Sequence, residues 1–388
     1  MIESITASLN AIDPDLFSKL DNQVTHEQLY RYLRPIADCH APSQSVPWTR
    51  GKVIEDLLRE EGLLRQGDVT FIRNYKQTGN AVLLLGENEV QKDIWLLAHL
   101  DMITYLIEPG SKGIYPLTPI CYHLMEPGQR EAVALGFDLD KGQYEILARG
   151  QIISYGDEAA PEFKTDEELV LQSGNRVCFH SEMSWDRETG EIKGSLDDAG
   201  GAAALLAAAI FLAEYDIELM LGLTDEEEGR AGMGSQSFCR GGARLLEHFG
   251  QPSLAIVSDI HEAAEMYGGG GPGGFQPGDG ASFAEKASGG VGEIVPPHLY
   301  ELQKRMASEL ERVGIRMREN SDGYVSRTEG INAMLRTPNV ALLGFLGKNR
   351  HFQRDVESAN IHDLVDLAKV VVCYALLTKT PLWKSLVS

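Results

Sequence analysis

The sequence predicts an α/β fold that carries a small all-β insertion, and three observations support this prediction. Continuous apolar runs alternate with amphipathic helical segments, as in an open α/β sheet. Residues 107–191 contain proline, glycine and short β-prone runs but no convincing amphipathic helix. The 388 residues, 43% of them hydrophobic, suffice for one large core and a smaller second core, so we expect two domains.

The expected division places residues 1–106 and 192–388 in the main domain and residues 107–191 in the insertion. Residue 35 is a proline and is expected to kink or end the first long helix. The segments with helical periodicity are 26–37, 50–61, 299–313 and 363–377, and the apolar strands are 69–73, 81–85, 93–98, 254–257 and 340–346. The β-prone runs of the insertion include 144–147, 151–155, 169–172 and 176–180.

Charge and composition narrow the class of protein. The chain has 35 Lys and Arg against 57 Asp and Glu, a net charge of −22, which argues against nucleic acid or an anionic membrane as partner. The longest apolar stretch, 202–213, is too short to span a bilayer. Residues 1–15 lack the pattern of a secretory signal. The five cysteines form no CxxC pair and suggest no disulfide framework. We therefore expect a cytoplasmic protein.

The stretch 217–229, IELMLGLTDEEEG, is the centre of the functional prediction. An apolar run, expected to be a buried strand, stops at four consecutive carboxylates, residues 225–228. Open α/β sheets place their chemistry just beyond the carboxyl ends of strands. Four adjacent negative charges repel one another unless a cation lies nearby, and a divalent metal would supply that cation. A solvated acidic loop is the alternative interpretation.

Other acids and histidines follow strands or precede a helix in the same way. His99 and Asp101 follow the strand 93–98, and alternate residues of an extended backbone project together, which suits a metal ligand with a supporting carboxylate. A plain hydrogen-bonded pair gives the same pattern. Asp197 and Asp198 precede an alanine-rich helix, where one aspartate suffices as N-cap. The second aspartate is explained if its carboxylate bridges two metal ions.

Two further candidates, Asp259 and His351, follow the strands 254–257 and 340–346. Together these imidazoles and carboxylates suit zinc and other first-row divalent ions. Their number exceeds what one catalytic zinc needs, so we expect two ions that share a carboxylate and activate a water, with a free carboxylate as base. This chemistry is amide hydrolysis. The glycine-rich segment 268–290 lacks the Lys-Ser/Thr signature of a phosphate-binding loop.

These motifs occur in a characteristic order: AHLD at 98–101, LDDAGG at 196–201, TDEEEG at 224–229, SD at 258–259 and RH at 350–351. In this order and spacing, residues 26–388 resemble the di-zinc aminopeptidases of the glutamyl aminopeptidase and tetrahedral aminopeptidase group. The β-rich insertion falls between His99 and Asp197, where that family keeps its lid domain. The resemblance implies a mixed-sheet zinc-peptidase catalytic domain of the phosphorylase/hydrolase type with an inserted, β-barrel-like lid.

The resemblance also implies a role for each site residue. His99 and Asp259 complete one metal site, Glu227 and His351 complete the other, and Asp197 bridges them. Glu226 is the general base, and Asp101 holds His99. A slip of one residue along the acid run would shift both glutamate roles. His362 competes with His351 as the last ligand, and a strict alignment on Arg350 puts Gln353 in that place. The polar segment 321–330 is expected to line the site.

We therefore expect a metallo-aminopeptidase that removes N-terminal residues from short peptides with two divalent ions. Zinc is the expected metal, and cobalt and manganese tolerate the same ligands. The resemblance implies a homo-oligomer, either a dimer or a hollow dodecamer. Two alternatives stay open. One is an N-acyl amino acid deacylase or carboxypeptidase that uses the same metals, and the other is a catalytically silent scaffold.

Overall fold

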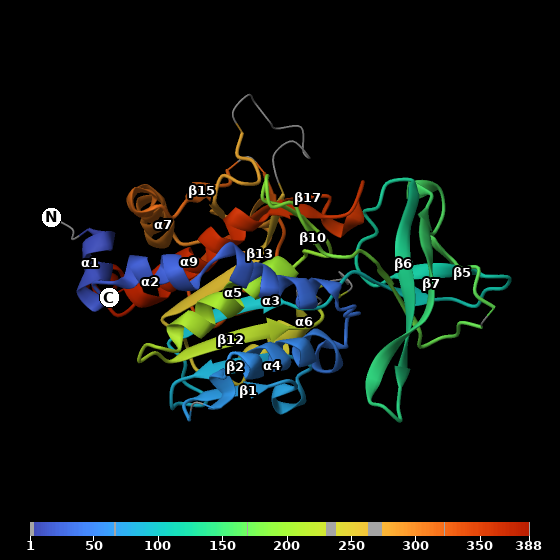
Figure 1. Ribbon diagram of the computed structural model, residues 1–388, viewed down its shortest axis with the longest axis horizontal. Coiled ribbons are helices and arrows are strands. Elements are labelled where there is room, and N and C mark those ends of the chain that lie inside the picture. Colours follow the sequence, from blue (N-terminus) through green and yellow to red (C-terminus); the bar gives the residue numbers. More distant parts are fainter. Residues whose placement is uncertain are drawn as a thin grey trace.

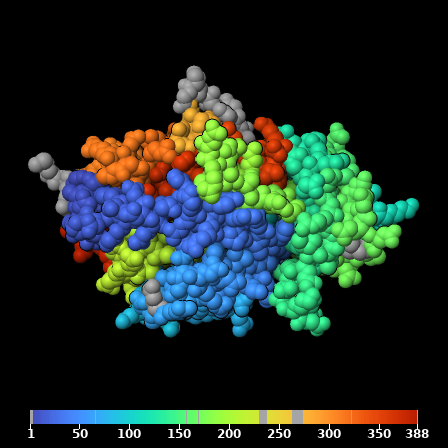
Figure 2. Space-filling model, viewed as in Figure 1, coloured from blue at the N-terminus to red at the C-terminus, as the bar shows by residue number. Residues whose placement is uncertain are grey.

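The computed structural model describes residues 4–65, 67–168, 170–229, 238–262, 274–321 and 323–387. Its body is a large β-sheet with helices on both faces, and a β-barrel stands at one end of the elongated molecule (Figure 1). In the space-filling view, the barrel adjoins the N-terminal part of the chain (Figure 2). Trp48 of the body contacts Phe137 of the barrel, with ring centroids 5.6 Å apart.

The large sheet is mixed, as expected. Strands β12, β3, β13 and β17 are mutually parallel neighbours in that order, whereas β1, β2 and β12 pair antiparallel. The sheet order is β1 (Val69–Ile72), β2 (Ala81–Leu85), β12 (Leu219–Thr224), β3 (Ile94–His99), β13 (Leu254–Glu262), β17 (Val340–Lys348), β18 (Ser358–Asn360), β11 (Glu191–Lys193) and β10 (Ser184–Trp185). Strands β14 (Ala281–Phe283), β15 (Met317–Glu319) and β16 (Tyr324–Val325) pair at its margins.

Alternating residues of the central strands feed two separate cores, because successive side chains of a strand point to opposite faces. Leu96 and Ala98 belong to one core, and Trp95 and Leu97 belong to the other. The helices of the first core are α1 (Ile5–Ile12), α2 (Leu16–Gln23), α3 (His26–Asp38), α4 (Arg50–Glu60), α5 (Ala199–Leu212), α7 (Pro297–Leu310), α9 (Ile361–Leu377) and α10 (Pro381–Val387). Helices α6 (Arg240–Leu246) and α8 (Gly330–Ala333) cover the second.

Helix α5 lies against the sheet and against α9. Thirteen of its 14 residues are buried, and most are alanine or glycine. Small side chains permit this close approach: a Cβ on Gly200 would lie 2.6 Å from the ring of Phe345 in β17. The packing fixes the amino end of α5, where the Asp198 side chain accepts a hydrogen bond from the Gly201 backbone N–H at 3.0 Å. Asp198 is thus the N-cap, and Asp197 precedes it.

The barrel is closed and has its own core. Its strands, in the order β4–β5–β8–β7–β6–β9, are β4 (Thr104–Ile107), β5 (Ile114–Pro119), β8 (Glu162–Lys164), β7 (Gln143–Ser154), β6 (Gly128–Asp138) and β9 (Arg176–Phe179). Tyr105, Phe163 and Phe179 are among the side chains that fill it. The expected β insertion between His99 and Asp197 is therefore confirmed as a six-stranded barrel. The division at residues 106/107 and 191/192 stays a prediction.

Several local expectations were wrong. The runs 144–147 and 151–155 form one strand, β7, because β6 pairs with it along its whole length and a bulge at Ala134 and Leu135 absorbs the irregularity. Residues 170–172 are not a strand. Of the kink or end expected at Pro35, the end does not occur: α3 continues to Asp38, which burial of Ile36 and Ala37 in the core favours. Residues 268–273 of the glycine-rich segment lie outside the described residues.

Among the residues that the structure describes, no helix combines the length and the apolar character needed to cross a membrane.

Candidate metal centre

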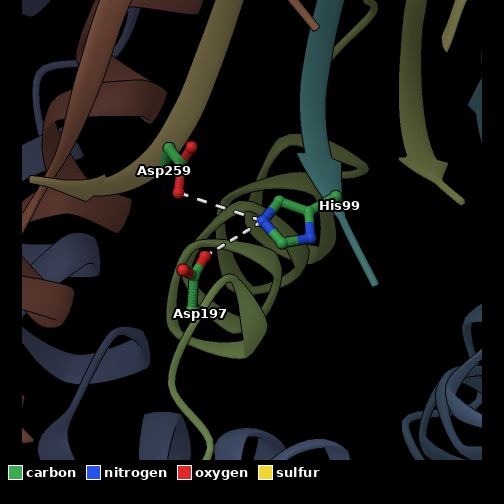
Figure 3. Close-up of side chains that lie close together, drawn as sticks. All are labelled: His99, Asp197 and Asp259. Atoms are coloured by element: carbon green, nitrogen blue, oxygen red, sulfur yellow. Dashed lines mark hydrogen bonds and ion pairs between the residues drawn. The ribbon is translucent and has the colours of Figure 1, made fainter. Parts of the chain in front are cut away.

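The candidate centre lies where the parallel strands of the large sheet end. His99 is the last residue of β3 and pairs in register with Thr224, the last residue of β12. Asp259 lies in β13, next to β3, and Asp197 comes from the turn before α5 (Figure 3). Asp259 was expected just after a strand, but β13 continues to Glu262 because β16 and β17 pair with its last residues. Its side chain still points to His99 (Figure 3).

Five buried side chains and the partly buried Glu227 form three overlapping groups of potential metal ligands. Within each group, one ligand atom from every residue lies within 4.8 Å of the others. The groups are His99, Asp197 and Asp259; His99, Glu227 and Glu228; and Asp197, Glu228 and His351. The structure therefore brings together buried histidines and carboxylates from distant parts of the chain.

Asp197 connects the two histidines. Its Oδ1 lies 3.1 Å from Nε2 of His99, and its Oδ2 lies 3.6 Å from Nε2 of His351. His351 Nε2 is also 3.2 Å from Oε1 of Glu228, while His99 Nε2 is 3.9 Å from Oδ1 of Asp259. The Oδ2 atom of Asp197 is buried and accepts no hydrogen bond from any residue that the structure describes. A carboxylate with one oxygen toward each histidine has the arrangement of a bridging ligand.

The electrostatics of the centre favour a cation. Burial, and then the neighbouring Asp197, raise the pKa of Asp259 well above its usual range. Burial likewise raises the pKa of Glu227, with Glu228 adding to the effect. His99 is buried, which opposes protonation, yet hydrogen bonds to Asp101 and Asp197 raise its pKa well above the usual value. Buried carboxylates that repel one another need positive charge, and the nitrogen and oxygen donors fit zinc-type divalent ions.

Asp101 supports both His99 and the acid run. The backbone oxygen of Asp101 lies 3.1 Å from His99 Nδ1, and its carboxylate Oδ1 lies 3.6 Å from the same nitrogen. The carboxylate accepts the backbone N–H groups of Glu227 at 3.1 Å and Glu228 at 3.2 Å, and the hydroxyl of Ser43 at 2.5 Å. Asp101 therefore holds the turn after β12 against the end of β3.

Glu226 points away from the three groups. Its backbone φ is +60°, and its carboxylate contacts Arg244 and lies 3.0 Å from Nε of Arg240. The next two residues, Glu227 and Glu228, are the ones near His99. The turn has this register because Asp101 accepts the backbone N–H groups of these two residues, while Asp225 accepts those of Gln44 and Val46.

His351, not His362, lies at the centre. His351 belongs to a short 3₁₀ turn, η9 (Arg350–Phe352), and has φ of +58°. Glu357 fixes this turn by accepting the backbone N–H of His351 at 2.9 Å, and it also accepts that of Asp197 at 3.0 Å. Burial and the nearby Asp197 raise the pKa of Glu357 to about 8. His362 instead packs edge-on against His26, 4.3 Å between centroids. Gln353 is absent from the three groups.

Three residues of the centre lay outside the predicted ligand and base set. Glu228 belongs to the acid run, but no periodicity selects one member of a turn. Glu357 ties the turns of Asp197 and His351 together, a role that no local motif announces. Ser326 donates its hydroxyl hydrogen bond to Oδ2 of Asp259 at 3.0 Å, which brings the segment 323–330 to the centre.

The chain has the fold of several solved aminopeptidases. The aminopeptidase APDkam598 from the archaeon Desulfurococcus kamchatkensis superposes with a TM-score of 0.70 and 18% identity, covering 94% of this chain and 98% of that chain. The TET aminopeptidase of a Thaumarchaeota archaeon from marine sediment superposes with a TM-score of 0.69 and 13% identity, covering 93% of this chain and 99% of that chain. The TET1 peptidase of Pyrococcus horikoshii superposes with a TM-score of 0.64 and 18% identity, covering 89% of this chain and 99% of that chain.

The sequence matches no protein-family model, and no curated protein matches it. At identities of 13–18%, the likeness to these solved structures establishes the fold. The fold expected from the sequence motifs, that of the tetrahedral aminopeptidases, is therefore confirmed.

Proposed function

We propose that this protein is a metal-dependent aminopeptidase that removes N-terminal residues from short peptides. The observation that carries the proposal is the trio of overlapping, mostly buried donor groups that share His99, Asp197 and Glu228. They lie at the carboxyl edge of a sheet, where α/β enzymes hold their active sites. The fold shared with solved aminopeptidases supports the same activity.

Two divalent ions fit this donor set. We assign His99 and Asp259 to one ion, Glu228 and His351 to the other, and Asp197 to both, with zinc as the expected metal and cobalt or manganese as alternatives. When bound, such a pair lowers the pKa of a water and polarises the carbonyl to be attacked. The ligand role expected for Glu227 moves to Glu228, because the carboxylate of Glu228 is the one beside His351.

Glu227 takes the role of general base that was expected for Glu226. Its carboxylate lies within reach of both His99 and Glu228. Burial raises the pKa of Glu227, which suits a group that accepts a proton from water and passes it to the leaving amine. Glu226 is held by Arg240 and Arg244 and serves to position the turn. Asp101 orients His99 and fixes the backbone of Glu227.

The barrel supports the aminopeptidase assignment over a deacylase or a carboxypeptidase, since it follows His99 and precedes Asp197 as a lid domain would in the aminopeptidases. We also propose that the chain forms a homo-oligomer, a dimer or a dodecamer, and that it acts in the cytoplasm. The TET1 peptidase of Pyrococcus horikoshii assembles into a tetrahedron or an octahedral shell. Light scattering of the purified protein tests the assembly.

The activity is tested with elemental analysis of metal content and with hydrolysis of aminoacyl p-nitroanilides and N-acyl amino acids. The native protein is expected to bind about two divalent ions per chain and to cleave the aminoacyl substrates. Glu227→Gln is expected to keep the ions and to lower kcat by about 10²–10⁴-fold, the usual contribution of a general base. Glu226→Gln, one residue away, is the matched control and should retain most activity.

Other results point elsewhere. Turnover of N-acyl amino acids alone would assign the deacylase reaction. A protein that binds metal but hydrolyses neither class of substrate would be a scaffold. If Glu226→Gln abolished turnover and Glu227→Gln did not, the base would be Glu226 and the assignment to Glu227 would be wrong.

A further inference from the structure

Arg327 lies beside the candidate centre and is held by aromatic rings. Its neighbour Ser326 contacts Asp259. The guanidinium carbon of Arg327 lies 3.4 Å from the ring centroid of Phe238 and 6.0 Å from that of Tyr122, a side chain that is 54% exposed. The ring of Phe238 covers one face of the guanidinium, as in a cation–π contact.

Phe238 and Tyr122 each adjoin a cysteine whose thiol contacts a carboxylate of the centre. Phe238 precedes Cys239, whose thiol donates to Oε1 of Glu227 across 3.7 Å. Tyr122 follows Cys121, whose thiol interacts with the carboxylate of Glu228. The chain therefore reaches Arg327 from three segments, and each segment touches a different carboxylate of the centre. This convergence places the guanidinium at the approach to the proposed reaction site.

The guanidinium of Arg327 has no carboxylate partner among the described residues. Within the described part of the chain, its Nε is buried and forms no hydrogen bond, while its backbone N–H donates to the hydroxyl of Ser288. Two other arginines near the centre differ, because Arg350 pairs with Glu262 and Arg244 pairs with Glu226. Near the centre, Arg327 is thus an arginine that the described residues leave without a carboxylate, with its face on the ring of Phe238.

Stacking on a ring occupies the face of a guanidinium but leaves its in-plane N–H donors free. Those donors match the two oxygens of a carboxylate, which they bind in a bidentate manner. The two aromatic rings restrict the rotation of the side chain, so less conformational entropy is lost when a ligand binds. The site is thus suited to an incoming carboxylate.

We propose that Arg327 recognises a carboxylate of the substrate and so determines specificity. This inference rests on the proposed aminopeptidase function. The carboxylate has two sources in a peptide, the side chain of an acidic N-terminal residue and the C-terminal carboxylate of a short peptide. Both present the same group to the same donors, and the two sources are separated by experiment.

The test measures binding by calorimetry to the metal-loaded protein, with two matched pairs of probes. L-Glutamate and L-glutamine differ in the side-chain carboxylate, and Leu-Ala and Leu-Ala amide differ in the C-terminal carboxylate. The native protein should bind the carboxylate member of one pair more tightly. Arg327→Gln should lower the affinity for that carboxylate probe by about 10- to 100-fold, as expected for loss of a charged hydrogen bond. The affinity for its neutral partner should stay nearly unchanged.

Two further variants distinguish a loss of carboxylate recognition from a general loss of folded structure. Arg327→Lys keeps the charge but loses bidentate geometry, and it should retain part of the preference. Arg187→Gln is the matched control, because Arg187 also stacks on a ring, that of Trp185 at 4.3 Å, but pairs with Glu27. It should bind all four probes as the native protein does.

The outcome identifies the source or overturns the proposal. A preference within the first pair assigns the side-chain carboxylate, and one within the second pair assigns the C-terminal carboxylate. Equal binding within both pairs, or an equal loss for charged and neutral probes in Arg327→Gln, would overturn it. Hydrolysis of leucyl and glutamyl p-nitroanilide is measured in parallel. The absence of hydrolysis of both substrates refutes the proposed aminopeptidase function even where Arg327-dependent binding persists, so the two failures are distinguishable.

Discussion

The two halves of the candidate centre differ in how the backbone presents their ligands. His99 and Asp259 stand on β3 and β13, two adjacent strands of the parallel region. Glu228 and His351 stand on turns, one after β12 and one after β17, and His351 has a left-handed backbone with φ of +58°. We refer to them as the strand half and the turn half. Asp197 joins the two halves.

The difference shows what holds each half in place. In the strand half, hydrogen bonds between neighbouring strands fix the backbone, and alternation then decides where each side chain points. In the turn half, the carboxylates of Asp101 and Glu357 fix the backbone by accepting N–H groups of Glu227, Glu228 and His351. The turn half is therefore expected to be more sensitive to changes outside the ligand set.

The largest effect is expected from Asp197→Ala, which removes the residue common to both halves. Both ions should lose a ligand, so metal content should fall toward zero and aminoacyl hydrolysis should fall below detection. Elemental analysis after dialysis and a p-nitroanilide assay measure this. Two ions that remained bound at native affinity would show that the halves are independent and that Asp197 does not bridge them.

The next effect separates the halves. Asp259→Ala and Glu228→Ala each remove a ligand from one half, so each variant should retain about one ion per chain. The two single variants should leave different sites occupied, which spectra of the cobalt-substituted protein can compare. Identical spectra from the two variants would contradict the assignment of these carboxylates to separate ions.

A smaller effect is expected from Glu357→Gln, which changes only the support of the turn half. Loss of this carboxylate should weaken metal binding by about 10- to 100-fold, as found for residues that orient metal ligands. Metal titration by calorimetry measures the change. Glu301→Gln, an exposed glutamate paired with Lys304, is the control and should bind metal normally. Equal affinity in the two variants would mean that the turn needs no such support.

The smallest effect is expected from Glu226→Gln. This change removes the ion pairs with Arg240 and Arg244, which are 43% exposed, so the free energy of unfolding should fall by about 1 kcal/mol or less. Metal content should be unchanged. Urea denaturation of the metal-loaded protein measures the free energy of unfolding, and elemental analysis measures the metal content. Loss of an ion in this variant would show that Glu226 is a metal ligand.

The strand half could be predicted from sequence because its signals are local. The runs before His99 and Asp259 are apolar and continuous, which predicts buried strands, and neighbouring parallel strands bring their carboxyl ends to one edge. Even the extension of β13 past Asp259 left its side chain beside His99, because the direction of a strand side chain depends only on alternation. The all-β insertion between His99 and Asp197 followed from composition, and its barrel-like form was implied by the resemblance.

The glutamate of the turn half could not be predicted to the residue. The acid run contains three consecutive glutamates, and the choice of Glu227 and Glu228 for the centre depends on Asp101 and on two arginines in α6, Arg240 and Arg244. The contacts of Asp101 join residues more than 100 positions apart. The contacts of the two arginines cross a turn, where the sequence shows no helical or strand periodicity. The placement of His351 at the centre, where His362 does not lie, depends on Glu357, which accepts the backbone N–H of His351.

The sequence by itself determined the α/β class, the inserted all-β domain and the five chain regions that supply the candidate ligands, because apolar periodicity and strand length are properties of neighbouring residues. Only the tertiary structure decided which glutamates face the histidines and which arginine stacks on Phe238 beside the centre. Such choices depend on backbone N–H groups and charges from distant segments, and these meet only when the chain has folded.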